Sequence, residues 1–328
     1  MNTLLEQLKS QLSDNAYKNF ALALSNDYTS KYSLESIAED CNLMEMLSNS
    51  NEYAISIAKD SENITNRWQI KLIRFNDSVS LSRGLPIIEN FGFKLIDEVP
   101  YKIKLSDGNI IYICDFGVDV PEGLESKIDD KNLMNSLKSA IIAAFTRQVD
   151  SDSLNKLVLY SDFTARQVSM IRSVVKYMVQ TSLPFSATYI SETLRKYNYV
   201  SWLFLHLFEA KFCPKHHSSE QVAHYSGLIE DELNKVQSID EDQILKSIYS
   251  VINAMLRTNF YQKDDKGEAK PYISFKLESA KVLNLPKPHP LYEIFVHSIR
   301  FEAVHLRGGK VARGGLRWSD RKEDFRTE

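Results

Sequence analysis

The end of the sequence concentrates the side chains best suited to bind an anion. Four of the eleven glycines fall there (Gly308, Gly309, Gly314, Gly315), and from Arg300 to Glu328 eight lysines and arginines stand against five aspartates and glutamates. Each Arg-Gly-Gly unit places a guanidinium beside backbone amides that no side chain covers, so one anion can contact both. Arg313 and Arg317 flank Gly314-Gly315. We therefore predict a carboxylate cradle at these four residues.

Two other interpretations of this segment stay open. It could be a glycine-rich hairpin edge with solvated arginines. It could also resemble an RNA-binding Arg-Gly-Gly box, but such boxes are long, disordered and repeated, whereas here two copies lie in a stretch that contains Val, Leu and Trp. We expect no nucleic-acid partner.

Other motifs point to no nucleotide or metal site. Gly309 and Gly314 have Walker A spacing, but Gly315 and Leu316 stand where Lys and Ser or Thr are needed. No strand precedes a Gly-x-Gly-x-x-Gly fingerprint. The segment 213–217, followed by His224, sets one cysteine near three histidines, which is not a zinc pattern. A Ser-His-Asp or Cys-His nucleophile stays open, although no nucleophile elbow points to one.

The composition is that of an ordinary globular protein. The 328 residues are 43% hydrophobic and 25% charged, with a net charge of −3, enough to form one or two cores. The three cysteines (Cys41, Cys114, Cys213) are widely spaced and odd in number, which fits a reducing compartment. No signal peptide is visible, and no run approaches the roughly 20 apolar residues that cross a bilayer. We expect a cytoplasmic protein without membrane contact.

The elements that would position the cradle follow from periodicity. Residues 1–50 keep helical spacing. Within 51–118 the pattern predicts a β-α-β-β unit: Trp68–Leu72 alternates like a half-buried strand, Ser80 begins a helix that ends near Gly92, and the Asp107-Gly108 turn joins two strands. The strands of this unit are predicted at Phe93–Ile96, Val99–Leu105 and Ile110–Phe116, with an extra one at Tyr53–Ala58. This order predicts an α+β unit of the ferredoxin-like or ACT type.

The rest of the chain divides into a helical and a β-rich part. Residues 119–258 read as helices, with candidate caps at Asp130, Asp162, Thr164, Ser186, and Asp240 with Gln243. Residues 259–328 read as strands, at Tyr272–Leu277, Leu291–Val296 and Phe301–Val304. We therefore predict four segments: 1–50, 51–118, 119–258 and 259–328.

The run from His305 to Glu328 closely resembles the large bacterial NAD-specific glutamate dehydrogenases. Leu85–Gly92 with Asp115–Gly117 resembles an ACT-type module of that family. Further segments resemble its helical region and the entry to its catalytic domain: Leu183–Ser186, Leu207–Phe212, Leu256–Tyr261 and Lys270–Lys276. The resemblance covers nearly the whole chain.

The resemblance implies oxidative deamination of L-glutamate to 2-oxoglutarate and ammonia, with NAD as the cofactor. Compact members carry Lys-Gly-Gly-apolar-Arg, which Arg313, Gly314, Gly315 and Arg317 match with Arg in place of Lys. The family implies that this motif holds the substrate carboxylate. Its catalytic lysines, its catalytic aspartate and its dinucleotide domain lie downstream, so no catalytic or cofactor-binding residue is expected within these residues.

We therefore expect this chain to be the regulatory and helical part of such an enzyme plus the incomplete start of its substrate domain. It should be inactive alone, with the downstream catalytic portion as its partner and a homo-oligomer when complete. The alternative is a stand-alone ACT-type regulatory or amino-acid-binding module without catalysis.

Overall fold

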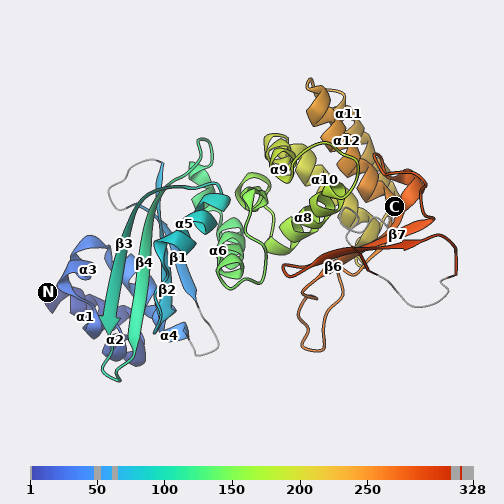
Figure 1. Cartoon of the computed structure of the whole chain (residues 1–328). Helices are drawn as coiled ribbons and strands as arrows, with labels where there is room; N and C mark the ends of the chain where they lie inside the picture. The colour runs from blue at the N-terminus through green and yellow to red at the C-terminus, as the bar shows by residue number, and fades with distance from the viewer. Residues whose placement is uncertain (1, 48–52, 61–65, 312–317, 320–328) are drawn as a thin grey trace. The chain divides into compact units, whose positions relative to one another are not determined.

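The computed structural model describes residues 2–47, 53–60, 66–311 and 318–319. The chain divides into two compact units, Met1–Thr146 and Arg147–Glu328, and each is described by itself. Both combine helices with one four-stranded antiparallel sheet (Figure 1), which confirms the predicted α+β class.

The first unit begins with short helices separated by serines. The helices are α1 (Asn2–Gln11), α2 (Asp14–Asn19), α3 (Asn26–Lys31) and α4 (Leu34–Met46), with a 3₁₀ turn η1 at Ala21–Ala23. The hydroxyls of Ser13, Ser25 and Ser33 each accept a hydrogen bond from a backbone N–H in the first turn of the helix that follows. These caps explain why the segment breaks into separate helices. The prediction of a helical start is confirmed.

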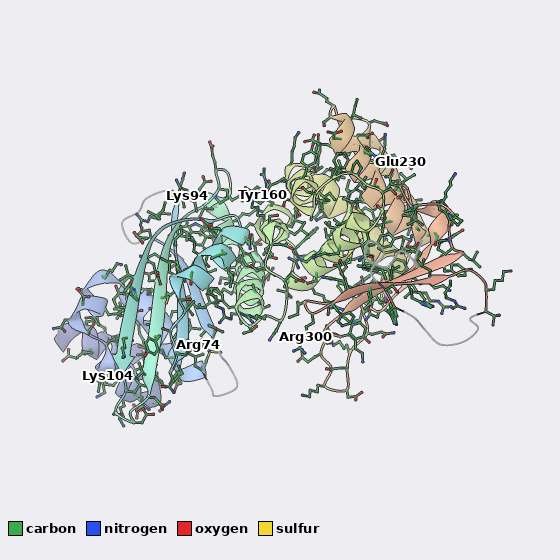
Figure 2. The ribbon with its side chains drawn as sticks, viewed as in Figure 1. Arg74, Lys94, Lys104, Tyr160, Glu230 and Arg300 are labelled. Atoms are coloured by element: carbon green, nitrogen blue, oxygen red, sulfur yellow. The ribbon has the colours of Figure 1, made fainter. Side chains whose placement is uncertain are left out.

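The first sheet has the strand order β1-β2-β4-β3, with every neighbouring pair antiparallel. Its elements are β1 (Ala54–Lys59), β2 (Arg67–Phe75), α5 (Leu81–Asn90), β3 (Lys94–Lys104) and β4 (Ile110–Asp119). Gly92 and Gly108 both adopt positive φ, at the end of α5 and in the β3–β4 turn, as the sequence predicted. The two predicted strands at 93–96 and 99–105 form one strand, whose ends Lys94 and Lys104 are labelled in Figure 2.

Both faces of this sheet are covered. The N-terminal helices pack on one face, while α5 and α6 (Lys131–Phe145, capped by Asp130 after the 3₁₀ turn η2, Glu125–Asp129) lie on the other (Figure 1). Trp68 and Ile70 are buried toward α5 and α6, and Lys71 and Ile73 toward the N-terminal helices. The prediction of a half-buried strand here is wrong, because alternation identifies the two faces of a strand but not what packs on each.

The second unit begins with helices. They are η3 (Ser153–Lys156), α7 (Leu157–Ser161), α8 (Ala165–Val179), α9 (Ala187–Lys196), α10 (Asn198–Phe212), α11 (Ser219–Leu233) and α12 (Ile239–Ala254). Thr164 and Ser186 cap α8 and α9 as predicted. Two predicted N-caps are wrong. Asp162 is the C-cap of α7, in a left-handed conformation, and the N-cap of α12 is Ser238 rather than Asp240. The Ser238 hydroxyl accepts from the Glu241 N–H, which leaves Asp240 inside the first turn.

The second sheet has the order β5-β6-β7-β8, again antiparallel throughout. Its strands are β5 (Met255–Thr258), β6 (Ile273–Glu278), β7 (Tyr292–His297) and β8 (Glu302–Arg307), with a 3₁₀ turn η4 at Ser279–Lys281. Helix α8 packs against β6 and β7. The three strands predicted in residues 259–328 are confirmed, with ends shifted by a few residues. Across the described parts of the chain, no helix is both long and apolar enough to span a membrane.

Candidate functional site

The predicted cradle residues Arg313, Gly314, Gly315 and Arg317 lie outside the described residues. The chain on both sides of them is described. Val304 and Ser319 form an isolated antiparallel bridge, with N-to-O distances of 2.9 and 3.0 Å. The chain thus leaves β8 after Arg307 and comes back to the same strand at Ser319.

Side-chain contacts support both flanks. The rings of His305 and Trp318 lie 5.8 Å apart, and Arg307 Nη2 donates to the Lys310 carbonyl at 3.0 Å. Because strand register fixes β8 to β7, the flanks of the cradle are tied to the second sheet. The described residues before and after the predicted cradle thus both contact β8.

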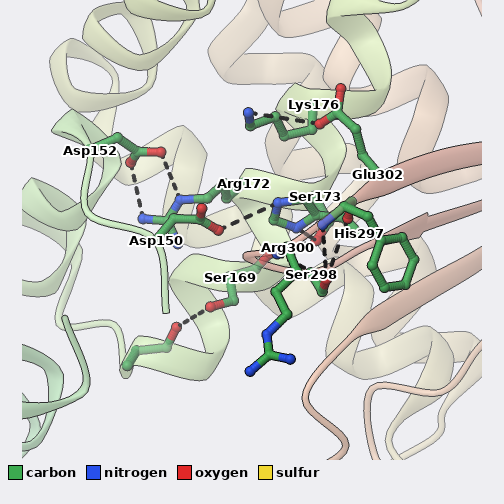
Figure 3. A network of polar contacts seen from close by, with 12 residues as sticks. Asp150, Asp152, Ser169, Arg172, Ser173, Lys176, His297, Ser298, Arg300 and Glu302 are labelled. Carbon is green, nitrogen blue, oxygen red and sulfur yellow. Dashed lines mark hydrogen bonds and ion pairs between the residues drawn. The ribbon is translucent and has the colours of Figure 1, made fainter. Parts of the chain in front are cut away.

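A polar face of α8 holds the β7–β8 hairpin. Residues at spacings of three, four and seven share one helix face. The contacts are Ser173 Oγ with His297 Nδ1 (3.0 Å), Tyr177 Oη with Glu293 Oε2 (2.7 Å), Gln180 Nε2 with Glu302 Oε1 (3.2 Å) and Lys176 Nζ with Glu302 Oε2 (3.7 Å). Figure 3 shows the contacts of Ser173 and Lys176. Directional polar contacts of this kind fix the hairpin on the helix more specifically than apolar packing would.

His297 is a buried titratable group of this network. Its Nε2 lies 3.4 Å from Asp150 Oδ2, and its ring is almost fully buried. Burial is the main cause that lowers the pKa of His297 to about 4; the nearby charges of Arg172 and Lys176 lower it further, whereas Asp150 opposes the shift. The imidazole is therefore neutral near pH 7.

The contacts run from Ser173 to His297 to Asp150, as in a Ser-His-Asp catalytic triad. This is the nucleophilic chemistry that the sequence analysis left open. Ser173 is fully buried inside α8, and its hydroxyl also lies 2.8 Å from the Ser169 carbonyl. A nucleophile must meet its substrate at hydrogen-bond distance, which a side chain with no exposed surface cannot do. The geometry therefore assigns these three residues to holding the structure together.

The same helix holds η3 through Arg172. This guanidinium is 1% exposed and contacts both Asp152 oxygens, from Nε at 2.8 Å and from Nη2 at 3.0 Å. Arg172 Nη2 also donates to Asn155 Oδ1 at 2.6 Å. The fork geometry of arginine suits such bidentate pairing. Helix α8 therefore connects the start of the second unit with its sheet.

The first unit holds a second buried polar cluster, between the N-terminal helices and the sheet. Lys71 of β2 is 2% exposed and forms an ion pair with the fully buried Asp40 of α4. The Tyr28 hydroxyl donates to Asp40 Oδ2 at 2.6 Å, and the Tyr32 hydroxyl donates to Asp115 of β4. Burial raises the pKa of both carboxyl groups, against the effect of Lys71. These contacts place five charged or phenolic groups between the N-terminal helices and the sheet.

Sequence reasoning missed both clusters. Lys71 sits in an alternating strand and reads as a solvated residue, and His297 follows a predicted apolar strand without a motif around it. In the sequence, the one sign of either cluster is a polar residue within a pattern that otherwise predicts buried core. The histidine-rich segment behaves differently: Cys213 caps α10, and the His224 ring lies 5.5 Å from that of Tyr225. Among the described residues, no three metal-ligating side chains come together.

A dinucleotide does not fit the described residues. Dinucleotide sites form at the carboxyl ends of parallel strands joined by crossover helices. Both sheets of this chain, as far as it is described, are antiparallel. No step of a hydride transfer is therefore assigned to these residues.

Three consecutive parts of the chain match known protein families. Residues 52–132 match "Glutamate dehydrogenase, ACT3 domain", residues 149–214 match "Glutamate dehydrogenase, helical motif 3", and residues 228–328 match "Bacterial NAD-glutamate dehydrogenase, catalytic domain". The last match starts inside α11, ahead of the boundary predicted at residue 259. The flanks of the cradle lie within it.

Three full-length proteins whose sequences are similar to this chain have the same name. NAD-specific glutamate dehydrogenase of Pseudomonas aeruginosa is 39% identical over 79% of this chain, that of Halomonas elongata 34% over 100%, and that of Mycobacterium tuberculosis 33% over 76%. The chain spans 16 to 20% of the length of these relatives.

Proposed function

Because the chain belongs to the bacterial NAD-specific glutamate dehydrogenase family, we propose that its residues form part of an enzyme that converts L-glutamate, NAD and water to 2-oxoglutarate, ammonia and NADH. The three family matches follow one another along the chain, and together they span both units. In this proposal residues 51–118 are a regulatory ACT-like unit, 119–258 a helical region and 259–328 the start of the substrate domain.

Arg313 and Arg317 bind the substrate carboxylate, and Gly314 and Gly315 give it access to the backbone. A guanidinium can hold a carboxylate through two parallel hydrogen bonds. The observation that supports this assignment is the Val304–Ser319 bridge, since it brings the chain that follows the motif back to β8, and α8 contacts the hairpin that contains this strand.

NAD is the cofactor of the whole enzyme, and the downstream catalytic portion binds it. The antiparallel sheets of the described residues offer no dinucleotide crevice, which supports this division. A polypeptide of these 328 residues is accordingly inactive alone, and the complete enzyme is a homo-oligomer that works in the cytoplasm.

Two arginine variants in the complete enzyme test the carboxylate assignment. Hydrogen bonds to charged groups contribute about 1.5–3 kcal/mol, so Arg313→Met and Arg317→Met should each raise KM for glutamate roughly 10- to 100-fold. KM for NAD should stay unchanged. Arg300→Met, at an exposed position in the β7–β8 turn, is the matched control. Unchanged glutamate KM in both variants would contradict the assignment.

Inactivity of the isolated chain is tested by complementation. NADH absorbance should not rise when the purified 328-residue chain meets glutamate and NAD. Adding the separately expressed downstream portion should restore turnover. Glutamate-dependent turnover by the chain alone, persisting through repurification, would contradict this part of the proposal.

One observation favours the alternative of an amino-acid-binding module. A cavity of about 350 Å³ in the first unit lies between α4, β1 and α6, with an apolar lining that includes Leu43, Met46 and Ile142 beside Lys138 and Asn135. Calorimetric titration of the twenty amino acids against residues 1–146 tests it. Binding there, combined with no activity after complementation, would favour the alternative.

A further inference from the structure

Ser169, Ser173, His297 and Asp150 share two protons in a row of contacts. Ser173 Oγ lies 3.0 Å from His297 Nδ1 and 2.8 Å from the Ser169 carbonyl, while His297 Nε2 faces Asp150 at 3.4 Å (Figure 3). A serine hydroxyl has one proton to donate, and a neutral imidazole has one N–H. The positions of these two protons decide which contacts are attractive.

Neither of the two arrangements places a proton in every contact. If Ser173 donates to Ser169, then His297 Nδ1–H must donate to Ser173, and a bare Nε2 lone pair faces the Asp150 carboxylate. If Ser173 instead donates to Nδ1, then Nε2–H faces Asp150, and the contact is attractive. In this second case the oxygens of Ser173 and Ser169 lie 2.8 Å apart with no proton between them. Both arrangements, however, keep a hydrogen bond between Ser173 Oγ and His297 Nδ1, so His297 joins β7 to helix α8 in either one.

We propose that His297, which contacts Ser173 of α8 and faces Asp150, is a positioning residue that fixes the β7–β8 hairpin and thereby the strand with which the chain pairs again at Ser319. The consequence for substrate binding rests on the proposed function. The effect on the hairpin does not, since it follows from described contacts alone.

A few contacts connect His297 with Val304, the residue that pairs with Ser319. His297 pairs with Glu302 in the β7–β8 register, and Glu302 is held by Gln180 and Lys176 of the same helix. Val304, two residues further along β8, receives Ser319 through two backbone hydrogen bonds. The hairpin turn itself is closed by Ser298, whose N–H donates to the Phe301 carbonyl at 2.8 Å. Loosening His297 therefore loosens the strand on which the returning chain pairs.

Hydrogen exchange on the 328-residue chain tests the structural step. His297→Phe keeps an aromatic ring but removes both polar contacts, and His297→Gln keeps an amide that can donate toward Asp150. One lost hydrogen bond contributes about 0.5–1.5 kcal/mol, so His297→Phe should speed exchange at the Val304 and Ser319 amides by up to about tenfold. His297→Gln should exchange more slowly than His297→Phe. Amides of β1 in the first unit, which should not change, are the internal control.

A second pair of variants tests the contact with Asp150. The amide of Asp150→Asn can accept from Nε2–H or donate to a bare Nε2, so exchange at Val304 and Ser319 should stay near the wild-type rate. Asp150→Ala removes the acceptor and should speed that exchange. Equal rates in the two variants would overturn the role of Asp150 in holding His297. Unchanged exchange in His297→Phe, or an equal increase over the whole second unit, would overturn the positioning role.

Kinetics of the complete enzyme separate this proposal from the proposed function. His297→Phe should raise KM for glutamate while kcat changes less, and His297→Gln should restore part of the loss. If the arginine variants leave glutamate KM unchanged while His297→Phe still speeds exchange at Ser319, the proposed function fails and the positioning of the hairpin stands. If His297→Phe lowers kcat alone, the link from His297 to substrate binding is overturned.

Discussion

Lys71 of β2 lies directly across from Asp115 of β4, yet its ammonium group pairs with Asp40 of helix α4 instead. Asp115 is bonded by the Tyr32 hydroxyl and lies 3.9 Å from Lys31 at the edge of the cluster. Each buried carboxylate thus has its own partners. Lys71 of β2 and Ser56 of β1 reach Asp40 from the sheet, whereas Tyr28, Tyr32 and Lys31 come from the N-terminal helical layer. The helical layer and the sheet are joined by charge as well as by apolar packing.

We predict that Asp40→Asn strongly destabilises the first unit. Removing one partner of a buried ion pair leaves the other charge uncompensated, which costs about 3–5 kcal/mol. Urea denaturation of a variant that retains only Trp68, the single tryptophan of that unit, would report the loss. Adding Lys71→Met to Asp40→Leu should recover most of the stability, because an apolar pair leaves no buried charge.

An exposed ion pair provides the control for this experiment. Asp14 and Lys18 are 3.9 Å apart and mostly solvated. Asp14→Asn should change the free energy of unfolding by less than about 1 kcal/mol. An Asp40→Asn effect as small as that of Asp14→Asn would show that Lys71 finds another partner.

The stability of the first unit should fall as pH rises above the usual carboxylate range. Burial raises the pKa of Asp115 in the folded state, despite the hydrogen bond from Tyr32 and the charges of Lys71 and Lys31. The folded state therefore binds this proton more tightly than the unfolded state, whose value is about 3.9. The contribution is present at low pH and is lost as pH rises through the folded-state pKa.

Asp115→Asn should remove this pH dependence, because an amide does not titrate and its oxygen still accepts from Tyr32. Urea midpoints of the two proteins measured across mildly acidic to neutral pH would show the difference. If the urea midpoints of the two proteins changed equally with pH, the pKa of Asp115 would be the same in the folded and unfolded states.

His297 should make the second unit less stable in acid. Its pKa is lowered to about 4 in the folded state, mainly by burial, against about 6.5 when unfolded. The unfolded state therefore binds the proton more readily, so stability is fully present above about pH 6.5 and is lost as pH falls toward 4. The curve of His297→Gln should be flatter over this window, measured by the fluorescence of Trp202, which stacks on His206 at 3.6 Å.

Helix α8 should depend on its N-terminal cap. The Thr164 hydroxyl accepts from the Gln167 N–H, and the Gln167 side chain accepts from the Thr164 N–H. Thr164→Ala should destabilise the second unit by about 1 kcal/mol, and Thr164→Ser should cost little because it keeps the cap. Denaturant midpoints followed by Trp202 would compare the two. Equal midpoints would show that packing alone holds this helix end.

Local elements of the fold were readable from the sequence because their causes are local. The Asp107-Gly108 turn, the caps at Asp130, Thr164 and Ser186, and the alternating strands all follow from residues a few positions apart. The error at α12 has the same origin, since Ser238 and Asp240 are both good caps and only the backbone path chooses between them. The cradle assignment remains a prediction because those residues lie outside the described part of the chain.

The sequence by itself determined most of the order of helices and strands, the α+β class and the family resemblance, because propensity, periodicity and motif spacing act along the chain. It placed Met255–Thr258 in the helical region, whereas these residues form strand β5 and pair with β6. Only the tertiary structure decided that Lys71 is buried beside Asp40, and that Ser173 and Asp150 enclose His297. Residues 31 and more positions apart meet in these contacts, and nothing in their local pattern specifies the partner. Burial then removes water from them, which turns an ordinary lysine and an ordinary histidine into groups that hold helices and strands together.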